Sequence, residues 1–131
     1  MSVIPSLAAG LAQLQSLANF IDSGSSNATF IFYDDTKPAN VSVAANNSAG
    51  LVTLTLPKPC FKELKTNSIE LYPSDVATVT KTGTAVWARL YNGNGDAVAD
   101  FAVGTDITMT NSSLVLGASL TMNSITLSPS N

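Results

Sequence analysis

The chain has 131 residues, which allows one domain with a hydrophobic core but is too short for two. Only 11% of the residues are charged, against about 25% in an average soluble domain, and the net charge is −3. So few basic residues argue against a nucleic-acid partner, which would need many Lys and Arg contacts with phosphates. The absence of histidine excludes most zinc sites and most catalytic constellations.

Residues 3–22 form the one predicted helix. Leu7, Leu11 and Leu14 recur at the three- and four-residue spacing of a single helix face, and Ile21 continues that face. Two interpretations of this amphipathic helix stay open. Its apolar face either closes an open end of its own β core or packs, as an arm, on a partner subunit. The second interpretation makes the three leucines candidate interface residues.

The next part of the chain is predicted to form short strands separated by turns. Residues 28–33 have the aromatic and β-branched composition of a strand, and both of its faces look covered. Further strands are predicted at 41–43 (a weak strand or a loop), 51–56, 69–72 and 76–80. Residues 60–66, with their lysines, read as a solvated loop. Asp34 and Asp35 are interpreted as turn residues that bond to the local backbone, rather than as an acid pair.

Cys60 is the only cysteine, so the chain cannot form an intrachain disulfide. Without a histidine to activate the thiol, we expect a buried or half-buried hydrophobic side chain rather than a nucleophile. No apolar run reaches the roughly 18–20 residues of a membrane span, and no Lys or Arg precedes the apolar N-terminal part, as a signal peptide would require. The sequence therefore predicts no membrane partner and use without secretion.

The clearest element is the stretch 83–104, which reads as one β-hairpin around the turn Asn92-Gly93-Asn94-Gly95. Symmetric pairing about this turn forms an apolar face from these pairs: Leu90 and Ala97, Ala88 and Ala99, Val86 and Phe101, Thr84 and Val103. The outward face then carries four residues, with Arg89 diagonal to Asp100: Trp87, Arg89, Val98 and Asp100. An aromatic residue beside an ion pair is typical of protein interfaces, so these four are interface candidates. The alternative is that Trp87 is half covered by its own sheet or helix.

After the hairpin, strands are predicted at 106–110, 114–116 and 118–127, the last with a bulge near Asn123-Ser124. The chain thus holds about eight or nine short strands with turn signals roughly every eight to twelve residues, which is typical of antiparallel sandwiches and barrels. The sequence predicts a single, mainly β domain over residues 1–131. Residues 28–127 are expected to form an antiparallel, jelly-roll-like β-sandwich, preceded by the helix.

No motif identifies a reaction. Asn92, Asn94 and Asp96 alternate like the oxygen ligands of a calcium loop, but Ala97 stands where such a loop needs glycine. The bidentate Glu that would complete the loop is also missing. A plain hairpin turn explains this segment, and we predict no metal, no cofactor and no enzymatic activity.

Several segments follow one another in a familiar order: a helix ending in a Gly-Ser loop, Phe-Ile-Phe-Tyr-Asp-Asp-Thr-Lys-Pro-Ala at 30–39, Leu-Val-Thr-Leu-Thr-Leu at 51–56, Gly-Thr-Ala-Val-Trp-Ala-Arg at 83–89, residues 95–104 and residues 116–121. This order resembles a family of small proteins encoded by tailed bacteriophages and prophages. The likeness spans most of the chain, and residues 57–60 and 71–73 depart from it most. The resemblance implies a virion structural protein without catalytic residues, one that decorates or cements the capsid or sits at the head–tail junction.

We therefore expect a non-enzymatic protein, made in the bacterial host cytoplasm and located in the virion, that binds the major capsid protein or other virion proteins. Low charge weakens self-repulsion and favours a homo-oligomer, with a trimer preferred. The alternatives are a head–tail connector, a tail component, or a tail-fibre module that binds carbohydrate or a host surface. In that last case the sugar-stacking and polar residues would be Tyr33, Tyr72, Trp87, Tyr91, Asn92 and Asp96.

Overall fold

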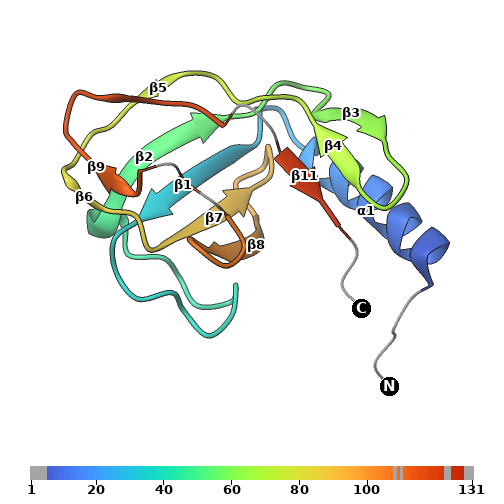
Figure 1. The fold of residues 1–131 in the computed structure, drawn as a ribbon, viewed down its shortest axis with the longest axis horizontal. Coiled ribbons are helices and arrows are strands. Elements are labelled where there is room, and N and C mark those ends of the chain that lie inside the picture. Colours follow the sequence, from blue (N-terminus) through green and yellow to red (C-terminus); the bar gives the residue numbers. More distant parts are fainter. Residues whose placement is uncertain (1–5, 108, 110, 123–124, 129–131) are drawn as a thin grey trace.

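The computed structural model describes residues 6–107, 109, 111–122 and 125–128. These residues form one α-helix, one short 3₁₀ helix and eleven strands (Figure 1). In chain order the elements are α1 (Leu7–Ile21), β1 (Thr29–Tyr33), η1 (Asn47–Ala49), β2 (Gly50–Thr55), β3 (Phe61–Leu64), β4 (Ile69–Leu71), β5 (Ala77–Thr78), β6 (Gly83–Thr84), β7 (Trp87–Tyr91), β8 (Ala97–Ala102), β9 (Ser113–Leu114), β10 (Ser119–Leu120) and β11 (Ile125–Leu127).

Helix α1 starts after Ser6, whose hydroxyl accepts a hydrogen bond from the Ala9 amide over 3.2 Å and caps the first turn. At its other end Ala18 and Ile21 are buried in the main core. Three half-buried leucines pack against the same core: Leu11, Leu14 and Leu17. The apolar face of the helix therefore packs on its own chain, on the side of β3 and β4 (Figure 1). The start of the predicted helix, residues 3–5, lies outside the described residues.

The largest sheet has four antiparallel strands in the order β2-β1-β7-β8. One face of this sheet carries buried side chains of the main core, such as Phe30, Phe32 and Leu54. The opposite face carries a second, smaller cluster centred on Tyr33 and Trp87. Both faces of β1 are covered, as the sequence predicted.

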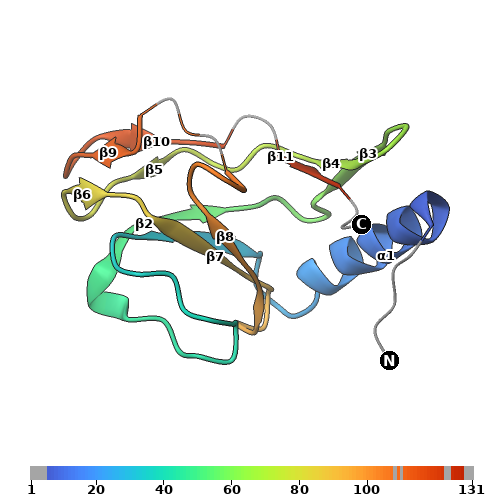
Figure 2. The same cartoon turned by 60° about the horizontal axis from the view of Figure 1, so that its bottom comes forward.

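Three smaller antiparallel sheets have the orders β11-β4-β3, β10-β5 and β6-β9. Figure 2 shows them along one side of the four-stranded sheet, with the β1–β2 connection, residues 34–49, along the other side. Side chains from the smaller sheets complete the main core between the two layers: Ile69, Leu71, Leu114 and Ile125. The four-stranded sheet is thus sandwiched between the small sheets and a loop.

The predicted hairpin over 83–104 is shorter than expected and has a different register. Gly83 and Thr84 leave the hairpin and pair with β9 instead. Leu90 pairs with Ala99 and Ala88 with Phe101, a shift of two residues from the symmetric pairing. One residue of the shift is already present at the turn, where Tyr91 pairs with Ala97, and the slip between Leu90 and Tyr91 adds the second. Beyond the slip, an even shift leaves the side chains of the paired residues on their predicted faces.

Three other local predictions fail or lie outside the described residues. Residues 61–64 form strand β3 rather than a loop, because they pair with β4, where Lys62 also forms an ion pair with Glu70. Residues 41–43 form a turn in which the Asn40 side chain accepts from the Ser42 amide. Asp106 and Ile107 turn back onto β8 instead of starting a strand, whereas Thr108 and Thr110 and the predicted bulge at 123–124 lie outside the described residues.

The prediction of a mainly β chain with one helix near the N-terminus is confirmed. The finer prediction, a jelly-roll-like sandwich, stays a prediction, because the described strands divide into one larger and three small sheets.

Candidate functional site

The hairpin face that was predicted to point outward is buried. Trp87 has no exposed area, and its ring stacks on Tyr33 with the centroids 4.4 Å apart and the planes 20° from parallel. The indole Nε1 donates to Asp35 Oδ1 over 2.8 Å, which ties the start of the β1–β2 connection to the sheet. Trp87 is therefore covered by its own chain, as the alternative interpretation held, but it is covered fully, by Tyr33 of its own sheet and by this connection, which folds back over the sheet (Figure 2).

Arg89 and Asp100 form a buried ion pair beside this aromatic stack. Arg89 Nε donates to Asp100 Oδ1 over 2.6 Å and Nη2 donates to Oδ2 over 3.0 Å, while the side chains are only 3% and 4% exposed. The hydrogen bond to Asp100 raises the pKa of Arg89. The guanidinium also lies 5.3 Å from the centroid of the Trp87 ring. The two charged residues are directly opposite each other rather than diagonal, because of the shifted register.

The remaining predicted interface residues lie apart from this cluster. Val98 packs against the main core, because the register slip near the turn moves it away from the face that carries Trp87, so its predicted place on the outward face is wrong. Leu11 and Leu14 are half-buried on the inner side of α1. Leu7, at the outer end of the helix, is 48% exposed and is thus the most accessible of the predicted contact residues.

The residues proposed to bind sugar do not form an exposed platform. Tyr33, Trp87 and Asn92 are buried, and Tyr72, which is 41% exposed, follows β4 in another sheet. The Tyr33 and Tyr91 hydroxyls are hydrogen-bonded over 3.0 Å. Burial and this hydrogen bond raise the pKa of Tyr33 well above its ordinary value.

The turn between β7 and β8 is a closed hydrogen-bonded unit. Asn92 Oδ1 accepts from the amides of Asn94 and Asp96, each over 3.0 Å. Gly93 packs against the α1–β1 loop so closely that an added Cβ would lie 2.1 Å from the Ser26 carbonyl oxygen. The Asn92 Nδ2 group is buried without a partner among the described residues. Over all the residues that the structure describes, no group of three or more Asp, Glu or Cys side chains is placed to hold a metal ion.

Cys60 is fully buried beneath the end of α1, as predicted. Its Sγ contacts the Ala18 carbonyl oxygen at 3.6 Å, and its amide donates to the Asp22 carboxylate. Burial, reinforced by the Asp22 charge, raises the pKa of the Cys60 thiol to about 12. A thiol with so high a pKa stays protonated at neutral pH and is a poor nucleophile.

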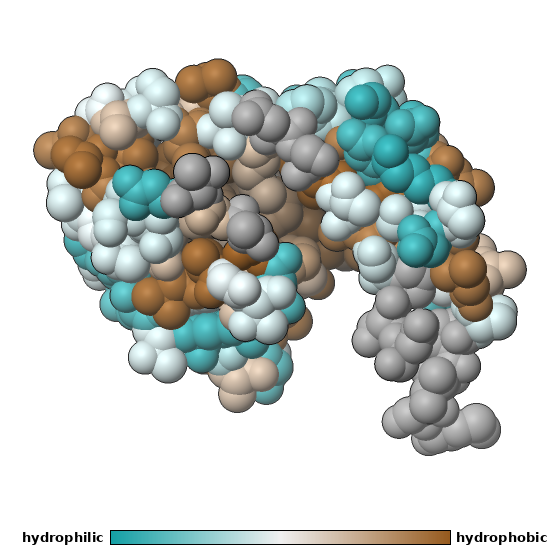
Figure 3. Space-filling view, viewed as in Figure 1, coloured by the Kyte–Doolittle hydropathy of each residue, from teal (hydrophilic) through white to brown (hydrophobic). Residues whose placement is uncertain are grey.

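A surface feature that sequence reasoning missed is an apolar tip, defined here as Val115 and Leu116 in the turn between β9 and β10. These side chains are 59% and 63% exposed. The turn is held by three hydrogen bonds: Leu116 N to Thr82 Oγ1, Gly117 N to the Val79 carbonyl and Ala118 N to the Val115 carbonyl, each over 2.9 Å. In Figure 3 hydrophobic surface lies at this end of the molecule. The sequence predicted a strand over 114–116, but β9 ends at Leu114, so the prediction of strand structure for Val115 and Leu116 is wrong and hid their exposure in a turn.

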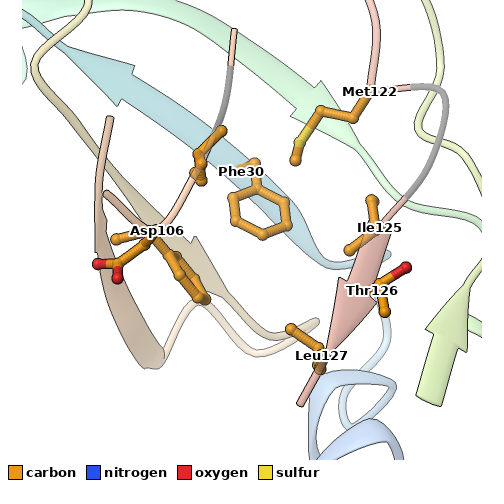
Figure 4. Close-up of a pocket in the computed structure, with 8 residues that line it drawn as sticks. Phe30, Asp106, Met122, Ile125, Thr126 and Leu127 are labelled. Atoms are coloured by element: carbon orange, nitrogen blue, oxygen red, sulfur yellow. The ribbon is translucent and has the colours of Figure 1, made fainter. Parts of the chain in front are cut away.

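A second missed feature is an apolar groove between β8 and β11. Its inner part is a pocket of about 290 Å³ lined by Phe30, Phe101, Asp106, Ile107, Met122, Ile125, Thr126 and Leu127. An outer hollow along β8 and β11 shares four of these residues, Phe101, Asp106, Thr126 and Leu127, but is more polar, because its other walls are Asp100, Thr105 and Ser128. Figure 4 shows Met122, Ile125 and Leu127 gathered around the Phe30 ring. The groove could not be read from the sequence, because its two walls are distant in the chain.

Within the described ranges, neither α1 nor the short 3₁₀ helix has the length and apolar character needed to cross a membrane. No protein-family model, no curated protein and no solved structure matches this chain.

Proposed function

We propose that the chain is a non-enzymatic structural protein of a phage virion that decorates or cements the head surface as a homotrimer or another ring. The observation that carries this proposal is the rigid apolar tip. Val115 and Leu116 are exposed on a turn whose backbone is held by three hydrogen bonds. Burying two aliphatic side chains against a partner stabilises the contact by roughly 1.5–3 kcal/mol each, and a rigid turn loses little entropy on binding.

The weak charge of the whole chain supports the same proposal. Only six basic and nine acidic residues are present, so repulsion between copies crowded on one particle is small. The four residues predicted to form the hairpin contact do not carry the proposal, since the chain covers Trp87, Arg89 and Asp100 itself. We place the contact with the phage head on the apolar tip instead.

Binding to phage heads tests the proposal. Heads lacking this protein would be purified from a bacterial strain whose prophage encodes it, and the 13.5 kDa chain would be added back and sedimented with the heads. We expect saturable binding, and at least tenfold weaker binding for the double variant V115S/L116S. The matched control is V41S/V43S, which alters two exposed valines on the β1–β2 connection and should bind normally.

Light scattering of the free chain measures its oligomeric state. A mass of three copies supports the trimer. A strict monomer without affinity for heads overturns the proposal, and binding to purified tails instead of heads replaces it with the head–tail or tail alternative.

A further inference from the structure

The edges of the described sheets differ in how they are protected. The open side of β2 is covered, because Asp75 Oδ1 accepts from the Thr55 amide over 2.8 Å and the Thr80 amide donates to the Leu51 carbonyl. The outer edge β3 carries a run of charges, with Lys62 and Lys65 paired to Glu70. Covered and charged edges resist pairing with another chain.

Within the described part of the chain, neither kind of protection extends along most of the β8 edge. Its one charged residue, Asp100, is neutralised by Arg89 and nearly buried. Among the described residues, the contacts that cover this edge are at Ala102, whose amide donates to Asp106 Oδ2 over 2.9 Å and whose carbonyl accepts from the amides of Asp106 and Ile107. The Val103 amide points to β7, where it donates to the Val86 carbonyl. Because successive strand amides point in opposite directions, the amide and carbonyl of Asp100 point away from β7, on the open side.

The apolar groove lies beside this open edge. Phe101 forms one wall from β8, and Ile125 and Leu127 form the facing wall from β11, which is also the outer strand of its sheet. A strand added to β8 would therefore hydrogen-bond to the open edge and place alternate side chains into the groove. Figure 4 shows the apolar side chains of Ile125 and Leu127, from β11, on the side of the pocket that faces Phe30.

The charges around the groove select the occupant. Among the described residues that line it, the two charged ones are both acidic, Asp100 and Asp106, and none is Lys or Arg. Arg89 neutralises Asp100, whereas Asp106 is exposed and forms no ion pair with any described residue. An incoming strand with a basic residue gains from Asp106, and an acidic strand is repelled.

From these observations we infer that the groove binds an extended segment of another polypeptide, which carries apolar side chains at alternate positions and a basic residue between them. The segment adds as a strand to β8. This inference deepens the proposed function, because it describes how an arm of a neighbouring virion protein would be held. Its test uses isolated peptides and therefore stands whether or not the chain is found on phage heads.

The probe is the fluorescein-labelled, amidated peptide Val-Thr-Val-Lys-Val-Thr, titrated with the whole chain and followed by anisotropy. The comparison peptides are Val-Thr-Val-Glu-Val-Thr, with reversed charge, and Val-Val-Val-Thr-Lys-Thr, without alternation. We expect saturable binding of the first peptide, weaker binding of the second by about tenfold, and none of the third. Amide shifts in NMR spectra should concentrate at residues 98–101 and 125–127.

Two pairs of variants locate the binding site. T126W places a large side chain at an exposed position shared by both parts of the groove and should abolish binding, whereas T78W, at an exposed position of β5, should not. D106N keeps an oxygen acceptor for Ala102 but removes the charge, so it should make the Lys and Glu peptides bind equally. D75N removes the matching charge at the edge of β2 and should leave their difference unchanged.

Binding that ignores alternation, or that survives T126W, overturns the inference. Self-association of the chain that T126W abolishes would also overturn it, since the groove would then hold a second copy rather than a foreign segment. Failure of head binding with intact peptide binding would overturn only the proposed function.

Discussion

Arg89 and Asp100 lie directly opposite each other on β7 and β8 and form a two-point ion pair, with N–O distances of 2.6 and 3.0 Å, that is almost fully shielded from water. A buried pair adds little net stability over an apolar pair of the same size, but removal of one partner leaves an uncompensated charge. The pair also lies beneath the β1–β2 connection, where Arg89 Nη2 reaches the Asn40 carbonyl over 3.5 Å.

The first prediction concerns this ion pair. D100N should lower the free energy of unfolding by about 3–5 kcal/mol, because the Arg89 charge stays buried without its carboxylate. In the double variant R89M/D100L the loss in the free energy of unfolding should be clearly smaller than the sum of the losses in R89M and in D100L, since neither charge remains. Urea unfolding followed by circular dichroism measures both quantities. A D100N loss below about 1 kcal/mol, the range of exposed pairs, would contradict the burial of this pair.

The second prediction uses the single Trp as a probe of the β1–β2 connection. Because Trp87 is fully buried, its fluorescence should be blue-shifted and insensitive to iodide in the native protein. D35A removes the acceptor of the indole N–H and should cost about 1–3 kcal/mol, while D35N, which keeps an oxygen acceptor, should cost less. Fluorescence and urea unfolding test this together. Ready quenching of native Trp87 by iodide would mean that the connection does not cover the sheet.

The third prediction compares two glycines of one turn. An added Cβ on Gly93 would lie 2.1 and 2.4 Å from the carbonyl oxygens of Ser26 and Ser23, whereas one on Gly95 meets nothing within 4 Å. Gly95 has a φ of +85°, so alanine at this position destabilises the fold only through its unfavourable backbone conformation, by about 1–2 kcal/mol. G93A should therefore destabilise the protein much more than G95A. Thermal melting of both variants measures the difference, and equal melting temperatures would rule out the contact between the two loops.

The fourth prediction follows from the raised pKa of Cys60, about 12 in the folded chain against an ordinary value of 9.0. In the unfolded chain the thiol loses its proton above pH 9.0, while the folded chain keeps it. The thiol's contribution to stability is therefore complete below pH 9.0 and is lost as the pH rises toward 12. Between pH 9.0 and the ordinary Tyr value of 10.0, the wild type should lose about 1 kcal/mol more than C60A. Urea midpoints at the two pH values check this, and parallel loss in both proteins would contradict it.

Local patterns in the sequence determined much of the secondary structure. The spacing of Leu11, Leu14 and Ile21 predicted the helix and its inner face, and alternation placed Phe30 and Phe32 together. Alternation in the hairpin also assigned Leu90 and Ala88 to the core face, and this assignment survived a register error of two residues because side chains repeat with a period of two. The burial of Cys60 followed from its chemistry alone.

Only the tertiary structure decided what covers each face and which edges stay open. Alternation tells which side chains share a face. The loop that buries Trp87, however, is held by the hydrogen bond that the Trp87 indole donates to Asp35, and no local pattern encodes a bond between residues so far apart in the sequence. The groove likewise exists because β8 and β11, which belong to different sheets, end up facing each other without pairing. The candidate contact surfaces therefore moved from the hairpin to the tip and the groove, since exposure depends on packing between distant segments rather than on residue type.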